Sequence, residues 1–195
     1  MWVDKRLVLK LTGISGILLI ILTILTIFTS IQITPWFSWA ENAISDLGRI
    51  EAASSIFNIG IIILGILMIF FSYGVMYILK DKLIGLYLLS ISGLLLIFIG
   101  LIPLPHIVHN YISVIFFITF PISFLFLGFD LYENERNFNT VMSVFAFFIV
   151  FLTFISPSVL LVNDGIAVSE AIILFPGFIW CFIFGLKILI WKKPI

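Results

Sequence analysis

Six long apolar runs, separated by short polar stretches, set the pattern of this chain. A helix needs about 20 predominantly apolar residues to cross a bilayer, and each run is long enough to do so. The pattern therefore predicts an all-α, polytopic integral membrane protein, with residues 1–195 forming a single six-helix domain. The expected transmembrane helices cover residues 8–33, 56–79, 83–103, 109–129, 140–161 and 168–190.

The basic residues predict how this bundle is oriented. Six crossings place both termini on one side, and nine of the ten Lys and Arg residues fall on that side. Only Arg49 falls on the other side. Cytoplasmic loops carry an excess of Lys and Arg, so both termini are expected in the cytoplasm and the protein in the cell membrane.

The composition excludes several classes of protein. Hydrophobic residues make up 63% of the chain and charged residues 10%, whereas soluble domains have about 45–50% and about 25%. No basic stripe accompanies a soluble fold, so a nucleic-acid partner is not expected. Cys181 is the only cysteine, which excludes disulfides within the chain and cysteine-rich metal sites. Nothing in the composition indicates the oligomeric state.

Small residues gather at two places inside the runs. Gly and Ser occupy positions 13, 15 and 16 of the first run and positions 90, 92 and 93 of the third. Transmembrane helices approach one another closely where side chains are small. These two places are therefore predicted to be close helix–helix contacts.

The connection after the first run predicts a further short helix. Thr34, followed by proline, suits a helix start, and Gly48 suits a helix end. Apolar residues between them recur at the 3, 4, 7 spacing of one helical face, which indicates an amphipathic helix lying in the outer interface. Such a helix is either a structural lid or the wall of a pocket, and its polar positions include Asn42, Ser45 and Asp46.

The only two histidines follow the third run. His106 and His109 are three residues apart and would share a face if the fourth helix has begun by then. With Asp46 they would supply the three protein ligands of a zinc site, so no cofactor is predicted but zinc is left open. Binding of a headgroup phosphate, proton transfer and hydrogen bonding between loops remain alternatives. The carboxylates available on this face are Glu41, Asp46, Asp164 and Glu170.

Two other polar residues lie near the outer helix ends. Glu170 suits the positive end of the last helix dipole, which explains it without catalysis. Asn58 lies one turn into the second run, where an amide should face protein or a water-filled cavity rather than lipid. The full set of candidate pocket residues is Asn42, Ser45, Asp46, Asn58, His106, His109 and Glu170.

The stretch NAISDLGRIEAASSIFNIGIIILGIL, residues 42–67, carries a resemblance to known families. Its ISDLG core, with Asn42 before it and the helix that opens at 56–58 after it, resembles the family labelled domain of unknown function 998. Members of that family are small multi-helix membrane proteins of archaea and bacteria, and a histidine-bearing segment after the third helix also fits them. The same core followed by IF is similar to the eukaryotic Frag/DRAM/Sfk family, which has six helices and is linked to glycolipid-anchor maturation, autophagy and lipid organisation. The resemblance implies a membrane-lipid context and supplies no catalytic residue.

Three functions remain open at this point. The preferred one is binding or handling of a lipid or other amphiphile in a pocket on the outer face, with membrane lipids as partners. The second is a metal-dependent hydrolase or transferase that acts on lipids at the same face. The third is a structural or assembly role, in which the outer motif only clamps the loop to the helices. Whether the protein is an enzyme stays open, with the balance against it.

Overall fold

A computed structural model of the chain describes residues 4–49, 51–79, 84–132, 137–157 and 165–190. In these parts the chain forms six long α-helices and one 3-10 helix of five residues, and no strand. The elements are α1 (Lys5–Gln32), η1 (Ile44–Gly48), α2 (Glu51–Leu79), α3 (Ile84–Leu101), α4 (Ile107–Tyr132), α5 (Asn137–Ile155) and α6 (Ala167–Ile190).

The predicted six-span, all-α fold is confirmed. Each apolar run matches one α-helix, and all six helices are long and apolar enough to cross a membrane. The shortest, α3, has 18 residues and rises about 27 Å, close to the thickness of a hydrocarbon core. The last part of the fifth predicted run, 158–161, lies outside the described residues.

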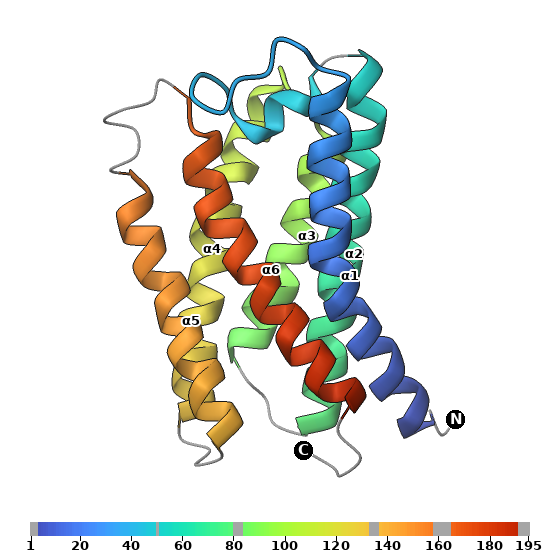
Figure 1. Cartoon of the computed structure of the whole chain (residues 1–195), viewed down its shortest axis with the longest axis vertical. Helices are drawn as coiled ribbons and strands as arrows, with labels where there is room; N and C mark the ends of the chain where they lie inside the picture. Colours follow the sequence, from blue (N-terminus) through green and yellow to red (C-terminus); the bar gives the residue numbers. More distant parts are fainter. Residues whose placement is uncertain (1–3, 50, 80–83, 133–136, 158–164, 191–195) are drawn as a thin grey trace.

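Successive helices run up and down through the bundle, as Figure 1 shows. α1 packs between α2 and α6, α3 joins α2 to α4, and α5 packs mainly on α4. Only 28% of the α5 span is buried, against 39–44% for the other five, so α5 lies at the edge of the bundle. The loop between α1 and α2, residues 33–49, closes one end, and we call it the cap.

The basic residues that the structure describes agree with the predicted sorting of charge. Lys5, Arg6 and Lys10 lie in the first turns of α1, and Lys187 lies in the last turn of α6. Both places are at the end of the bundle opposite the cap (Figure 1). Arg49 belongs to the cap. The other five basic residues of the predicted cytoplasmic side lie outside the described residues: Lys80, Lys82, Arg136, Lys192 and Lys193.

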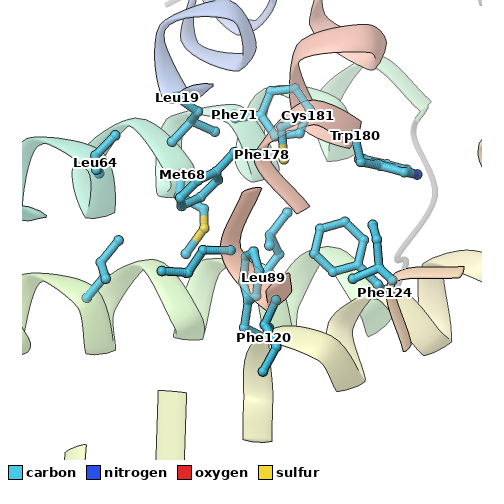
Figure 2. Close-up of a cluster of buried hydrophobic side chains, with 14 of the residues drawn as sticks. Leu19, Leu64, Met68, Phe71, Leu89, Phe120, Phe124, Phe178, Trp180 and Cys181 are labelled. Atoms are coloured by element: carbon cyan, nitrogen blue, oxygen red, sulfur yellow. The ribbon is translucent and has the colours of Figure 1, made fainter. Parts of the chain in front are cut away.

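Buried aromatic side chains contact one another in the core of the bundle, among them Phe120, Phe124 and Trp180 (Figure 2). Ring centroids are 5.1 Å apart between Phe120 and Phe124, 5.5 Å between Phe124 and Trp180, and 5.0 Å between Trp180 and Phe184. The Trp180 indole also donates a 2.9 Å hydrogen bond to the carbonyl of Met142 on α5. Lipid is as apolar as these side chains, so close packing and buried hydrogen bonds hold the helices together.

Glycines bring neighbouring helices into backbone contact, as the α2–α3 and α1–α6 crossings show. A Cβ placed on Gly93 of α3 would lie 2.8 Å from the carbonyl oxygen of Gly65 on α2. A Cβ on Gly185 of α6 would lie 2.8 Å from the carbonyl oxygen of Gly13 on α1, and Gly16 is equally crowded by α6. The close contacts predicted at positions 13, 16 and 93 are therefore confirmed.

The short helix predicted between Thr34 and Gly48 is present only in part: it ends at Gly48 as expected, but its predicted start at Thr34 is wrong. Only five residues near the end of the cap, Ile44–Gly48, are helical, as η1, and turns precede them. Thr34 does not begin a helix. Its hydroxyl points back along the chain and donates a 2.7 Å hydrogen bond to the carbonyl of Ser30 near the end of α1. It closes the end of α1 instead.

Hydrogen bonds to a distant segment explain why no α-helix forms in the cap. The carbonyls of Ala40 and Asn42 accept from the amides of Gly165, at 2.7 Å, and Ala167, at 2.8 Å. The Asn42 side chain accepts from the amide of Ser38 at 2.7 Å, which further competes with helical bonding. The middle of the cap is therefore bonded to the segment where α6 begins, and short turns within the cap satisfy other backbone groups.

Candidate functional site

The cap is anchored by Glu170 in the first turn of α6. Its Oε2 accepts a 2.6 Å hydrogen bond from the amide of Ile44, the first residue of η1. The Glu170 side chain is 7% exposed, and Ile44 and Leu47 are 3% and 0% exposed. A buried carboxylate loses hydration, and the amide donor and the helix dipole offset part of that loss. The contact joins two segments that the sequence analysis treated separately.

Asp46 organises the turn into η1. Its Oδ2 accepts a 2.8 Å hydrogen bond from the amide of Ala43, and its own amide donates to the Ala43 carbonyl at 3.1 Å. A side chain at the third helical position that bonds back to the N-cap amide forms half of a capping box. The guanidinium of Arg49 lies 3.9 Å from Oδ1 but is 54% exposed, so this pair adds little. Asp46 is therefore occupied by local structure.

We expect Asp46→Ala to destabilise the cap by about 1 kcal/mol, the usual cost of losing a helix cap. Hydrogen exchange of the Ala43 amide, measured on detergent-purified protein, should accelerate about fivefold. Glu41→Ala is the control, because Glu41 is exposed in the same loop and should leave this rate unchanged. Equal exchange in wild type and Asp46→Ala would contradict the capping role.

Both asparagines of the predicted pocket bind backbone groups of the cap. Asn42 accepts from Ser38, and Asn58 on α2 donates from Nδ2 to the carbonyl of Gly48 at 3.1 Å. A Cβ on Gly48 would lie 2.5 Å from the Asn58 Oδ1, so the absence of a side chain there lets η1 rest on α2. Asn58 faces protein, as the sequence predicted. Together with Asp46, these amides form a clamp that positions the cap.

The two histidines do not share a face. α4 begins at Ile107, so His106 precedes the helix and is exposed, whereas His109 is 2% exposed. Its Nδ1 lies 2.8 Å from the carbonyl oxygen of Ile102, to which it donates, and this bond links the end of α3 to α4. Its Nε2 has no hydrogen-bond partner among the residues that the structure describes. The shared face depended on α4 having begun by His106, and α4 begins one residue later, at Ile107.

The structure does not assemble the zinc site suggested by the sequence. Within the described parts of the chain, no three His, Cys, Asp or Glu side chains lie close enough to hold a metal ion. His106, His109 and Asp46 are all described, so this set of ligands does not converge. Asp164, another candidate carboxylate, lies outside the described residues.

A partly open cavity of about 40 Å³ lies beside η1 and is lined by residues of η1, α2, α3, α4 and α6. Three polar side chains line it: Ser45 and Glu170, which the sequence indicated, and Ser113 on α4, which it did not. Ser113 lies one helical turn after His109, and this spacing is the signal that could have revealed it. The remaining walls are aliphatic and aromatic.

A larger groove of about 370 Å³ runs between α1 and α2 near the cap. Ile59, on its wall, is 58% exposed, so the groove opens on the outside of the bundle. The sequence analysis missed this groove because it depends on how the faces of two helices meet. The groove is lined by Leu22, Thr26, Ser55, Ile56, Ile59, Gly60 and Ile63.

Comparison with known protein families places this chain in one of them. The sequence model described as "Protein of unknown function (DUF998)" matches residues 15–187. The chain belongs to the DUF998 family. The match begins within α1 and ends within α6, so it includes the cap, the cavity and the groove of this DUF998 protein. The first of the two resemblances is thereby confirmed, and the similarity to Frag/DRAM/Sfk proteins stays a prediction. No curated protein and no solved structure matches the chain.

Proposed function

We propose that this DUF998 protein binds a membrane lipid, with one acyl chain in the groove between α1 and α2. The single observation that carries the proposal is the groove itself, which holds about 370 Å³ and opens where six apolar helices would meet lipid. From Ser55 to Ile63 it follows two turns of α2, a rise of about 12 Å. That length suits part of an acyl chain.

The polar and apolar lining of the groove supports a lipid rather than a soluble ligand. Leu22, Ile56, Ile59 and Ile63 supply an apolar wall. Ser55 lies one turn into α2, so its hydroxyl is at the depth where an ester or headgroup would lie. The sorting of Lys and Arg supports an orientation with the cap outside the cell, which makes this lipid one of the outer leaflet.

The cap residues contribute to this function indirectly. Asn42, Asp46 and Asn58 bond to backbone groups of the cap, and the groove lies beside this clamp rather than inside it. We therefore place the lipid-binding site on the face between α1 and α2 rather than among the cap residues that the sequence analysis preferred. The clamp fixes the loop that joins the two helices of the groove.

We expect Ser55→Phe to abolish lipid retention without unfolding the protein. Ser55 is exposed, so the added ring would fill the groove without displacing buried side chains. Native mass spectrometry of protein extracted in mild detergent should show at least about tenfold less bound lipid than wild type, a loss of about 1.4 kcal/mol in binding. The melting temperature should be unchanged.

Val114→Phe is the matched control for this experiment. Val114 is 59% exposed on α4, outside the groove, and is expected to face lipid without a shaped site around it. This variant should retain lipid as wild type does. Equal retention by the Ser55 and Val114 variants would show that the groove does not hold the lipid.

A further inference from the structure

A cluster of basic side chains lies at the end of the bundle opposite the cap (Figure 1). Lys5, Arg6 and Lys10 occupy the first two turns of α1, and all three are exposed. Among the residues that the structure describes, none of the three makes an ion pair. The sorting of basic residues orients the chain in the membrane, and it leaves these charges without a counter-ion in the folded protein.

Little negative charge opposes this basic cluster. Its acidic neighbour on α1 is Asp4, whose Oδ1 accepts a 2.9 Å hydrogen bond from the amide of Arg6 and so caps the helix. The two helices packed against α1 add no carboxylate at this end, because neither 71–79 of α2 nor 182–190 of α6 contains Asp or Glu. Three basic groups and one acidic group therefore leave a net positive charge on the helix end.

Exposed apolar side chains lie beside the basic ones on the same helix. Leu7 precedes Lys10 by three residues and Ile14 follows it by four, so both are its neighbours on the surface of α1. Leu7, Leu11 and Ile14 are 50%, 53% and 38% exposed. They belong to a helix that is long and apolar enough to cross a membrane, where they would contact hydrocarbon. Positive charge beside an apolar strip matches a lipid better than a soluble anion.

We propose that the first turns of α1 bind an anionic phospholipid, with its phosphate between Arg6 and Lys10 and an acyl chain along the apolar strip. These two basic residues are one helical turn apart, about 6 Å along the axis, so one phosphate can accept hydrogen bonds from both. Each basic residue near a membrane surface strengthens the attraction of anionic lipid about fivefold. Because this end is the one expected in the cytoplasm, the lipid would belong to the cytoplasmic leaflet.

This site is separate from the groove of the proposed function. The groove lies near the cap, at the other end of α1, and none of its lining residues belongs to the basic cluster or the apolar strip. The groove is lined by no charged residue, so lipid retention there should not depend on the charge of the headgroup. The two proposals can therefore fail independently.

Native mass spectrometry of the full-length protein, released from lipid nanodiscs, tests the proposal. The nanodiscs would contain equal amounts of phosphatidylglycerol, which is anionic, and phosphatidylcholine, which is not, with the same acyl chains. Wild type should retain phosphatidylglycerol at least about tenfold over phosphatidylcholine. The triple variant Lys5→Gln/Arg6→Gln/Lys10→Gln should retain the two lipids within about twofold of each other. Its melting temperature should be unchanged, because all three side chains are exposed.

Two control variants and a salt series accompany this measurement. Lys5→Arg/Lys10→Arg keeps the charge and should keep the preference. Arg49→Gln removes the basic residue of the cap and should also keep it. Raising the salt concentration from about 0.1 M to about 1 M should weaken the preference of wild type, because the Debye length falls from about 10 Å to about 3 Å.

Three results would overturn the proposal. They are equal retention of the two lipids by wild type, an unchanged preference in the folded glutamine variant, and an equal loss of preference in Arg49→Gln. If the triple variant does not fold, Lys10→Gln alone decides, because it removes one exposed charge and should lower the preference about fivefold.

Ser55→Phe separates this site from the groove. It should reduce the retention of both lipids alike and leave their ratio as in wild type. A ratio that changes in Ser55→Phe and stays constant in the glutamine variant would assign the choice of headgroup to the groove, against the present proposal. Unchanged total retention in Ser55→Phe, with the preference of wild type intact, would count against the groove alone.

Discussion

Gly93→Val is expected to destabilise the bundle by about 3 kcal/mol, the upper end of the cost of overpacking a close contact. The new Cβ would lie 2.8 Å from the carbonyl oxygen of Gly65 and 2.9 Å from Cγ1 of Ile69. The carbonyl belongs to the backbone of α2 and cannot move aside, so the two helices must separate along their contact. Lipid would fill the gap about as well as protein does, so no hydrophobic gain opposes the separation.

Thermal unfolding in detergent measures this effect. Leu94→Val is the matched control, because it introduces the same β-branched residue at the next position of α3, where the side chain is 47% exposed. Its effect should stay within about 0.5 kcal/mol. If both variants melted at the same temperature, the contact between Gly65 and Gly93 would not limit the approach of α2 and α3.

The sequence predicted the parts of this fold that depend on local information. Each membrane span corresponds to one continuous apolar run. A helix in lipid satisfies its own backbone hydrogen bonds, so its sequence alone is enough to predict it. The glycine contacts were predicted for a similar reason, since small side chains mark places where helix backbones approach. Gly93 could be chosen in this way from the sequence, whereas its partner Gly65 could be identified only from the structure.

The cap could not be predicted in the same way. Its apolar spacing favours a helix, but the carbonyls of Ala40 and Asn42 accept hydrogen bonds from residues at the start of α6. Local periodicity contains no information about so distant a partner. Whether the two histidines share a helical face could not be predicted for a related reason. α4 begins at Ile107, one residue after His106, so His106 lies outside the helix.

The candidate site was predicted only in part. Asp46, Asn42 and Asn58 were expected to face a ligand, and the structure uses their side chains to hold the cap. Glu170 was expected to suit the helix dipole and was included among the pocket residues; the structure places it on a cavity wall and shows in addition that it joins η1 to α6. A cavity is formed where several helices meet, so its walls follow from packing rather than from any one segment.

Gly165→Val is expected to release the cap while the six helices remain folded. A Cβ at this position would collide with backbone atoms of Glu41 and Asn42. Because these are backbone atoms, they cannot move aside as the end of a flexible side chain could. The amide of Gly165 would then lose its 2.7 Å bond to Ala40. Such a collision, with the bonds lost beside it, should cost the cap about 3 kcal/mol.

Hydrogen exchange resolves this local opening from global unfolding. The amides of Asn42 and Ile44 should exchange about a hundredfold faster, since about 2.7 kcal/mol of local stability corresponds to that factor. Amides in the middle of α1 and α3 should keep their wild-type rates. Ile166→Val is the control, because Ile166 is the next residue, its side chain is 44% exposed, and its carbonyl accepts from the amide of Glu170 within α6.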